Sequence, residues 1–441
     1  MHTPQHFRII KACKQPLLGT THMRHKVSQW LQHSDYRTLL KNYSSLSLVQ
    51  LSNYILPLLT LPYLARVLGT EHFGLIIMAQ ATMIYLTLLT DYGFNLSATK
   101  EIANHQQDKH AVGHIFSTIM SIKCGLLTIG AIILTILIHT IPLFAIHQKL
   151  FILSYLIVIG NSFLPTFLFQ GLEKMSFIAL FNFTGKVVFT GLIFIIIQSQ
   201  SDYYLVHAIW GVSYILVDIG SIYIIINKLN IPILLPTWNK IKQYLHLSFE
   251  YFLSRIAIAI YLNANVILVG LILSPTSAGH YGGAEKLLFA LTTFYAPLIE
   301  TIYPYISRTK NKPFIKKIVL ITSAVNTLGC AIAFFMAPII VPIILGKAFI
   351  PSIPLFQWML VVALLHLPTS MIGYPVLGAL GYEKTANRSV IFGALVHIIL
   401  LATCYPYLSE PLHFIWIMIV SQSIIFAIRT LKLMRITQLW V

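Results

Sequence analysis

Four positively charged residues stand inside long apolar segments of this sequence. They are Lys123, Lys186, Arg255 and Lys286. A charge within the hydrocarbon of a bilayer is costly unless it faces a polar cavity or a partner of opposite charge, so such residues commonly mark the path of a substrate or an ion. The four cations therefore predict a polar interior that binds charged groups.

Three acidic residues accompany these cations. Asp218 lies within an apolar segment, and Asp91 and Glu250 lie near the ends of two others. A carboxylate in this setting can carry a coupling ion, because desolvation favours its neutral form and a nearby cation favours its charged form. We predict Asp218 as the ion-coupling residue, with Asp91 and Glu250 as weaker candidates near the interface. A structural role for Asp218 as a counter-ion stays open.

Other kinds of chemistry leave no pattern in the sequence. The cysteines, at positions 13, 124, 330 and 404, have neither metal-ligand nor disulfide-framework spacing. His110 and His114 stand one helical turn apart with no third ligand nearby, which favours a solvated loop-to-helix junction over a metal site. Neither Gly-Lys pair is followed by Ser or Thr, as a phosphate-binding loop requires. We therefore expect no metal, no cofactor and no enzymatic activity.

The segments that position these residues are those of a polytopic membrane protein. Of the 441 residues, 57% are hydrophobic and 10% are charged, whereas soluble proteins carry about 25% charged residues. A membrane-spanning helix needs about 20 mainly apolar residues. Twelve such segments are predicted, at residues 43–65, 74–95, 114–139, 150–170, 177–198, 204–226, 247–272, 281–304, 318–345, 354–378, 389–408 and 412–431. The expected fold class is an all-α polytopic membrane protein.

The surplus of positive charge is explained by orientation. The chain has 30 Lys and Arg against 13 Asp and Glu, a net charge of +17. If both termini are cytoplasmic, 23 cations, Arg429 among them, fall in the leader, the cytoplasmic connections and the C-terminal end, and 3 fall on the other side. This is the bias of the positive-inside rule. We therefore expect the lipid bilayer, and no nucleic acid, as the partner that this charge reflects.

The chain is predicted to divide into two halves. LGTEHFG (Leu68–Gly74) follows the first segment and LSPTSAG (Leu273–Gly279) follows the seventh, with Leu and Gly six residues apart in both. This weak repeat predicts parallel halves of six helices each, as in one class of secondary transporters. The predicted parts are a cytoplasmic leader without a cleavable signal peptide (1–41), a first bundle (42–226), a proline-containing cytoplasmic linker (227–246), a second bundle (247–435) and a tail (436–441).

Six segments together carry a family resemblance. They are NYSSLSLVQLSNYILPLLTLPYLARVLGTEHFG (42–74), DYGFNLSATKEIA (91–103), LFQGLEKM (168–175), YGGAEKL (281–287), YPYISR (303–308) and LGALGYEK (377–384). The first two are the most specific, because they combine polar, Pro, Gly and charged residues at fixed spacing. From about residue 42 to residue 435, the chain resembles the polysaccharide-export flippases of the bacterial O-antigen type. That family belongs to the same superfamily as the multidrug and toxin extrusion (MATE) transporters and the lipid II flippases, so a MATE-like fold is implied.

The resemblance implies a substrate and a direction of transport. The family translocates undecaprenyl-pyrophosphate-linked oligosaccharide repeat units from the cytoplasmic to the periplasmic leaflet of the bacterial inner membrane. Alternating access coupled to a proton or sodium gradient is implied as well. So is a monomer that works beside the O-antigen polymerase and the chain-length machinery.

Two rival functions share this hydropathy. A multidrug exporter of the same superfamily would have similar halves, but its cavity normally carries acids for cationic substrates, and the buried cations argue against it. An oligosaccharide polymerase would be expected to carry a sizeable periplasmic loop. Here the outside connections are short, about fifteen residues or fewer.

The depth of the buried cations suits a pyrophosphate. At 1.5 Å per residue, Lys123, Lys186 and Arg255 lie roughly 12 to 15 Å from the cytoplasmic ends of their segments, and Asp218 lies roughly 12 Å from its own. We predict that the three cations form an inward-facing trap in a cavity between the halves. Arg suits bidentate contact with phosphate oxygens, and Lys acts as a compact point charge.

Lys286 and Arg66 are predicted to receive or release the anion on the other side of the membrane. Simpler roles stay open for several of these residues. Arg66 could anchor the interface, and the lysines at positions 123 and 186 could reach towards the cytoplasm. Arg255 could form a structural ion pair with Glu250 or Asp218.

Overall fold

Helices make up nearly the whole of the chain that the structure describes. The computed structural model describes residues 34–293 and 295–437, and it contains no β-strand within them. The α-helices are α2 (Ser34–Asp91), α3 (Phe94–Asn104), α4 (Lys109–Thr140), α5 (Pro142–Ile146), α6 (Gln148–Phe163), α7 (Thr166–Gly171), α8 (Met175–Ile196), α9 (Leu205–Tyr223), α10 (Trp238–Ile272), α11 (Pro275–Thr293), α12 (Ala296–Thr309), α13 (Lys312–Leu345), α14 (Ser352–Met371), α15 (Glu383–Thr403) and α16 (Pro411–Thr437). Short 3₁₀- and π-helical segments join or extend them: η3 (Gln200–Tyr204), η4 (Ile224–Lys228), η5 (Lys347–Phe349), η6 (Ile372–Gly378) and η7 (Tyr405–Tyr407). The predicted all-α class is confirmed.

Nine helical stretches in the described residues are long and apolar enough to cross a membrane. The first of them, which covers residues 59–104, contains a break at Gly69, where φ is 70° and ψ is 179°. Only glycine adopts this conformation readily, so α2 consists of two rods. Three further rods join these nine stretches: the part of α2 before Gly69, helix α10, and the pair α11 and α12 counted as one. The described part of the chain therefore forms twelve helical rods. The prediction of about twelve transmembrane helices is confirmed.

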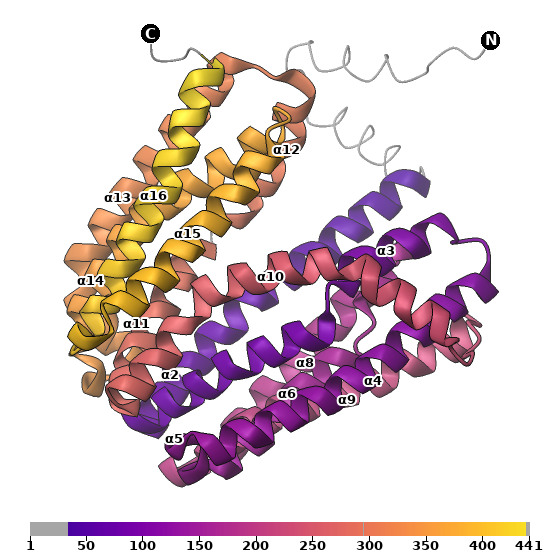
Figure 1. Cartoon of the computed structure of the whole chain (residues 1–441), viewed down its shortest axis with the longest axis horizontal. Coiled ribbons are helices and arrows are strands. Elements are labelled where there is room, and N and C mark those ends of the chain that lie inside the picture. The colour runs from indigo at the N-terminus through magenta and orange to yellow at the C-terminus, as the bar shows by residue number, and fades with distance from the viewer. Residues whose placement is uncertain (1–33, 294, 438–441) are drawn as a thin grey trace, which may run out of the picture.

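The rods form two groups that diverge from a shared corner (Figure 1). In the first group, α6 packs against α9, α8 packs against α2 and α9, and α3 packs against α7. In the second group, α14 packs against α11, α13 and α16, and α15 packs against α16. Helix α10 joins the groups, because it contacts α2 and α3 as well as α11 and α15.

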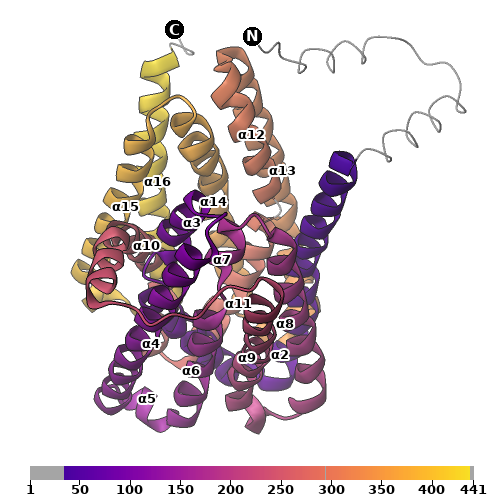
Figure 2. The ribbon, with the colours of Figure 1, turned by 90° about the vertical axis from the view of Figure 1, so that its right-hand side faces the viewer.

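The two ends of the rods differ in what they carry. We call the end where α2 begins and α16 ends the terminal end, seen at the top of Figure 2. We call the end that carries Gly69 and the start of α11 the far end. The connection between the sixth and seventh rods is shorter than the predicted linker, because η4 extends to Lys228 and α10 already begins at Trp238. The division into two domains at this connection stays a prediction.

Two helices of the first group are interrupted at neighbouring places. Helix α2 ends at Asp91, and Tyr92 and Gly93 adopt positive φ values of 43° and 80° before α3 begins. Helix α6 ends at Phe163 and is separated from α7 by Leu164 and Pro165. Because α3 packs against α7, the two interruptions lie in the same region. Interrupted helices at membrane depth are tolerated only inside protein or beside a cavity, and in transporters they commonly mark binding sites.

Arg429, counted from the sequence among the cations of the cytoplasmic side, is buried. Its Nε donates to Ser389 Oγ (2.8 Å), Nη1 to the Thr369 carbonyl (2.7 Å) and Nη2 to the Ala386 carbonyl (2.9 Å). The guanidinium fills a space at Gly373, where an added Cβ would overlap it. Arg429 therefore links α14, α15 and α16, and the side of the membrane on which it lies stays a prediction. Position near a segment end does not reveal that its side chain turns inward between three helices.

Gln357 supplies a hydrogen bond that a proline removes from helix α13. Pro338 lies inside α13 and has no N–H, so the carbonyl of Phe334, four residues earlier, lacks its helical donor. Gln357 Nε2 on α14 donates to this carbonyl at 3.2 Å. The packing of α14 against α13 thus supplies the hydrogen bond that the proline removes.

Candidate functional site

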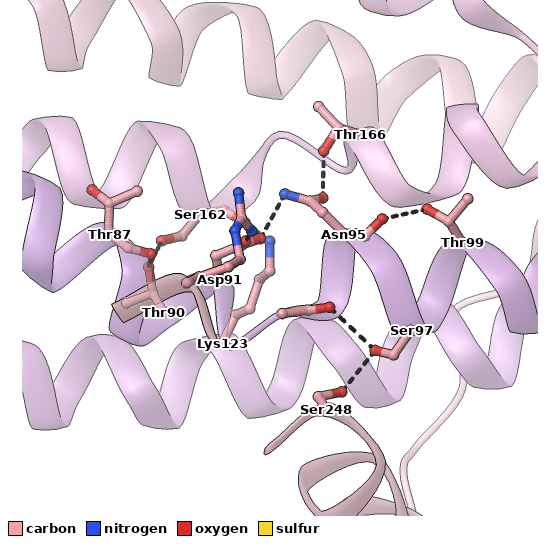
Figure 3. Close-up of polar contacts among 12 residues, drawn as sticks. Thr87, Thr90, Asp91, Asn95, Ser97, Thr99, Lys123, Ser162, Thr166 and Ser248 are labelled. Atoms are coloured by element: carbon pink, nitrogen blue, oxygen red, sulfur yellow. Dashed lines mark hydrogen bonds and ion pairs between the residues drawn. The ribbon is translucent and has the colours of Figure 1, made fainter. Parts of the chain in front are cut away.

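Helices α2, α4 and α10 bring Asp91, Lys123 and Arg255 together. Figure 3 shows Asp91 and Lys123 in this region. Asp91 is the last residue of α2, and its carboxylate forms an ion pair with Arg255 of α10. Lys123 of α4 is close enough to attract Asp91 and to repel Arg255. Lys123 also attracts Asp218 of α9. We call Asp91, Lys123, Asp218 and Arg255 the charged cluster.

Neutral side chains from both helix interruptions hold Asp91 in place (Figure 3). Asn95 Nδ2 donates to Asp91 Oδ1 at 2.6 Å, and Asn95 Oδ1 accepts from Thr166 Oγ1 at 2.6 Å. Thr166 begins α7, just after the second interruption. Hydrogen bonds to an ionised group are roughly twice as strong as neutral ones, so this chain of contacts fixes the carboxylate between α3 and α7.

Lys123 is buried within the first group of helices. Its side chain is 1% exposed, its Nζ donates to the Ser162 carbonyl at 3.1 Å, and it lies 5.5 Å from the centre of the Phe167 ring. Because α6 ends at Phe163, the Ser162 carbonyl is one of the last four in that helix, which lack helical donors and carry the negative end of the helix dipole. Lys123 therefore satisfies the broken end of α6.

Asp218 is the least satisfied member of the charged cluster. It is 3% exposed, and within the described residues neither of its carboxylate oxygens has a hydrogen-bond partner. Lys123 is the cation that attracts it. A buried carboxylate in this condition is costly as an anion, so it can bind and release a proton at a modest change of its surroundings.

Arg255 is the most open member of the charged cluster. Its side chain is 40% exposed, whereas that of Asp91 is 11% exposed. Arg255 comes from α10, and two further contacts join α10 to Tyr92, at the break between α2 and α3, and to α3 itself. Ser248 Oγ lies 2.7 Å from Ser97 Oγ, and the ring of Phe252 stacks on that of Tyr92 at 4.8 Å.

Three further residues, Lys186, Lys286 and Arg66, were predicted to bind substrate. Lys186 is half-buried on α8. Lys286 Nζ on α11 donates to Gln80 Oε1 on α2 at 3.0 Å. Arg66 donates to the Ile343 carbonyl in the last turn of α13, at the far end. These roles in substrate binding stay predictions.

Two of the predicted acids differ in exposure, and a third acid was missed. Glu250 is exposed on α10, whereas Asp91 is buried. Sequence reasoning did not single out Glu285, which attracts the adjacent Lys286 on α11. Its signal was available, because it is a carboxylate within the predicted segment 281–304. Asn95 and Thr166 offered no such signal, since neutral polar residues are common in membrane helices.

His110 and His114 lie at a solvated junction, and the described residues contain no cluster of three potential metal ligands. Their rings are 5.1 Å apart in an edge-to-face arrangement. Asp108 precedes them and accepts hydrogen bonds from the backbone N–H groups of His110 and Ala111 (2.9 and 3.0 Å). These bonds, above all that from Ala111, hold the pKa of the Asp108 carboxyl below its usual value. His110 thus belongs to the capped first turn of α4, and His114 lies in the following turn.

Comparison with known proteins places this arrangement among transporters. Residues 39–310 match the profile of a family described as "Polysaccharide biosynthesis protein". The chain is 30% identical over 370 residues to the Escherichia coli (strain K12) protein named "Putative O-antigen transporter", which covers 82% of this chain and 89% of that protein. It is 26% identical over 362 residues to a Shigella dysenteriae protein of the same name, with 81% and 91% covered.

Solved structures share the fold. An inward-facing multidrug resistance MATE family transporter of the MOP superfamily is 16% identical, with a TM-score of 0.67 over 90% of this chain and 98% of that one. An outward-facing MATE transporter of the same superfamily is also 16% identical, and its TM-score is 0.54 over 90% and 97% of the two chains. The MATE-like architecture is therefore confirmed.

Proposed function

The chain belongs to the polysaccharide biosynthesis protein family, and from this premise we propose that it flips undecaprenyl-pyrophosphate-linked oligosaccharide repeat units across the bacterial inner membrane. The observation that carries the proposal is the 30% identity to a protein named as an O-antigen transporter over 82% of this chain. In this proposal the terminal end faces the cytoplasm, because most of the cations lie there. The far end faces the periplasm.

The conformation supports a state open to the cytoplasm. The TM-score is higher to the inward-facing MATE transporter than to the outward-facing one, 0.67 against 0.54. The two groups of rods also diverge towards the terminal end in Figure 1. In this state the pyrophosphate enters from the cytoplasmic leaflet while the polyprenyl tail stays in the bilayer.

Arg255 is the cation best placed to contact the pyrophosphate first. Its side chain is 40% exposed even while it is paired with Asp91. A phosphate can replace the Asp91 carboxylate on the guanidinium through a bidentate contact. Asp91 then keeps Lys123 as a counter-charge, so the exchange leaves no buried acid unpaired. In this proposal Lys186 on α8 also attracts the pyrophosphate. Lys286 and Arg66 contact it later, as it moves towards the periplasmic side.

Asp218 is the proposed carrier of the coupling ion. Its burial without a hydrogen-bond partner in the described residues supports alternation between a protonated and a charged form. Asp91 and Glu250 are secondary candidates. Asp218→Asn keeps the shape and removes the charge, so transport in this variant is expected to lose its dependence on the ion gradient. An undiminished dependence on the gradient rules out this role.

The decisive experiment is complementation of a flippase deletion in the native strain. The wild type, Arg255→Ala, Lys186→Ala and Lys123→Ala are compared at matched abundance in the membrane, with the exposed Lys149→Ala as the control. Surface polysaccharide and cytoplasmic-leaflet lipid-linked repeat units are both measured. We expect the wild type and Lys149→Ala to restore surface polysaccharide, and Arg255→Ala to lose most of it while repeat units accumulate inside.

The same measurements separate the rival functions. A polymerase deletion would leave single repeat units at the surface instead of accumulating them inside. A multidrug exporter would change susceptibility to cationic drugs and leave the polysaccharide unaltered. If the native deletion shows no polysaccharide defect, the proposed substrate is wrong.

A further inference from the structure

The two repeated motifs of the sequence meet each other at the far end. Gly74 lies one turn into the second rod of α2, and Gly279 lies one turn into α11. A Cβ added to Gly74 would overlap the carbonyl oxygen of Pro275, and a Cβ added to Gly279 would overlap that of Thr70. We call these four residues the glycine crossing. It joins the first group of helices to the second.

The crossing is reciprocal. In each rod, the carbonyl that faces the other rod's glycine belongs to the residue four positions before that rod's own glycine. The Thr70 carbonyl, four residues before Gly74, faces Gly279, and the Pro275 carbonyl, four residues before Gly279, faces Gly74. This is the contact expected of two repeats related by a two-fold axis. Backbones approach this closely in membranes only through small residues, and dispersion is what stabilises contacts of this kind.

Buried apolar contacts continue the crossing on one side. Ile77, which is 4% exposed, packs against Gly282 of α11, and Met78, fully buried, packs against Gly270 of α10. Phe73 meets Phe349 edge to face at 5.4 Å. The far end is therefore closed by buried apolar side chains, of which Ile77 and Met78 lie over glycines.

An exposed polar contact lies beside the crossing. Arg66 comes from the first rod of α2 and donates to the Ile343 carbonyl at the end of α13, next to Gly346. The carbonyls in the last turn of a helix lack helical donors and attract cations. Because Arg66 is exposed, water can replace this contact at little cost.

We propose that the glycine crossing is the outer gate of the transporter, closed in this conformation and separated in the outward-open one, with Arg66 as its latch. The proposal rests on the proposed function only in requiring alternating access, whatever the substrate. At the crossing itself, the atoms that face Gly74 and Gly279 most closely are backbone atoms, so these two surfaces can separate without unpacking side chains. The alternative is a permanent pivot, closed in both states.

Cysteine accessibility in intact cells tests the gate. The probe is Ile77→Cys in the full chain freed of its four cysteines, reacted with a membrane-impermeant maleimide. In the closed gate this thiol is buried against Gly282 and labels slowly. Gly74→Ala and Gly279→Ala put a methyl group where no space exists, so they disfavour the closed state. We expect labelling to rise about 5- to 100-fold, because overpacking penalties shift two-state equilibria by factors of this size.

Glycines of other transmembrane helices supply matched controls. Gly125 on α4 and Gly191 on α8 have nothing within 4 Å of an added Cβ, so Gly125→Ala and Gly191→Ala are expected to label at the reference rate. Unchanged labelling in abundant Gly74→Ala and Gly279→Ala proteins overturns the gate in favour of a pivot. Equal increases in the controls overturn it as well.

Arg66→Gln keeps the test decisive if the alanine variants fail to accumulate. It adds no atom to the crossing and removes the charge of the latch, so we expect a labelling increase of about 2- to 5-fold, the size of a lost exposed contact. No increase with Arg66→Gln overturns the latch. Because labelling needs no polysaccharide, a gate that responds in a chain that fails complementation refutes the substrate and keeps the gate.

Discussion

Replacing Lys123 with Met distinguishes a structural lysine from a substrate-binding one. Methionine keeps an unbranched apolar side chain but removes the charge and the hydrogen-bond donor. In the structure the ammonium group is buried, donates to the Ser162 carbonyl, and attracts Asp91 and Asp218. We therefore expect Lys123→Met to destabilise the protein whether or not substrate is present.

The size of the effect follows from the contacts that are lost. Leaving the Ser162 carbonyl without its donor costs about 1–3 kcal/mol. Removing one partner from a set of buried charges costs about 3–5 kcal/mol, because Asp218 then loses the cation that attracts it. The two losses overlap, so we expect a total of about 3–5 kcal/mol. For a chain of 441 residues, that lowers the unfolding midpoint by about 3–5 °C.

Thermal unfolding of the purified protein in detergent measures this effect. Lys149→Met, which removes an exposed lysine, is the control and is expected to unfold at the wild-type temperature. The double variant Lys123→Met/Asp218→Asn is expected to regain part of the lost stability. The reason is that an amide in place of the Asp218 carboxylate no longer needs a cation.

Two outcomes would refute this reasoning. If Lys123→Met unfolds at the wild-type temperature and only transport is lost, Lys123 acts on the substrate and the α6-capping explanation is wrong. If the losses of the two single variants simply add in the double variant, Lys123 and Asp218 do not stabilise each other.

Three further changes test other parts of the structure. Arg429→Ala removes a buried guanidinium with three hydrogen bonds and is expected to cost about 3–5 kcal/mol, measured as a lower unfolding midpoint; a wild-type midpoint would contradict its role in joining α14, α15 and α16. Gln357→Leu removes the donor to the Phe334 carbonyl, so we expect a loss of about 1–3 kcal/mol and faster hydrogen exchange near Pro338, whereas exchange at the wild-type rate would show the bond to be unimportant. Asp108 has a lowered pKa in the folded protein, so it stabilises the first turn of α4 above its usual pKa of 3.8 and loses this effect as pH falls through the folded value. Asp108→Asn is expected to flatten this acid dependence, and identical pH profiles would exclude the carboxylate cap.

The helical framework could be predicted from the sequence because hydrocarbon thickness sets the length of each rod. Apolar windows identified twelve rods, and the structure has rods at these positions. Interruptions inside rods were less visible. TDYGF indicated the end of a segment, but the proximity of its break to the Leu164–Pro165 break follows from the packing of α3 on α7. Two helices must be placed before such a pair can be recognised.

The candidate site was predicted in part. Helical rise placed Lys123, Arg255 and Asp218 at similar depth, and the structure brings them into one cluster with Asp91. The same depth was predicted for Lys186, which is half-buried on α8 and whose place beside the cluster stays a prediction. Depth depends only on position along the helix axis, whereas partnership depends on rotation about that axis and on the neighbouring helices.

The sequence by itself determined which residues enter the membrane, how the charge is distributed and which motif is repeated, because the transfer energy of a residue depends mainly on its own side chain. Only the tertiary structure decided that Lys123 ends on the Ser162 carbonyl, that Arg429 turns inward, and that Gly74 meets Gly279. Hydrogen bonds, ion pairs and backbone contacts require two groups within a few ångströms. That condition joins residues from distant parts of the chain, and it is met only after the helices have packed.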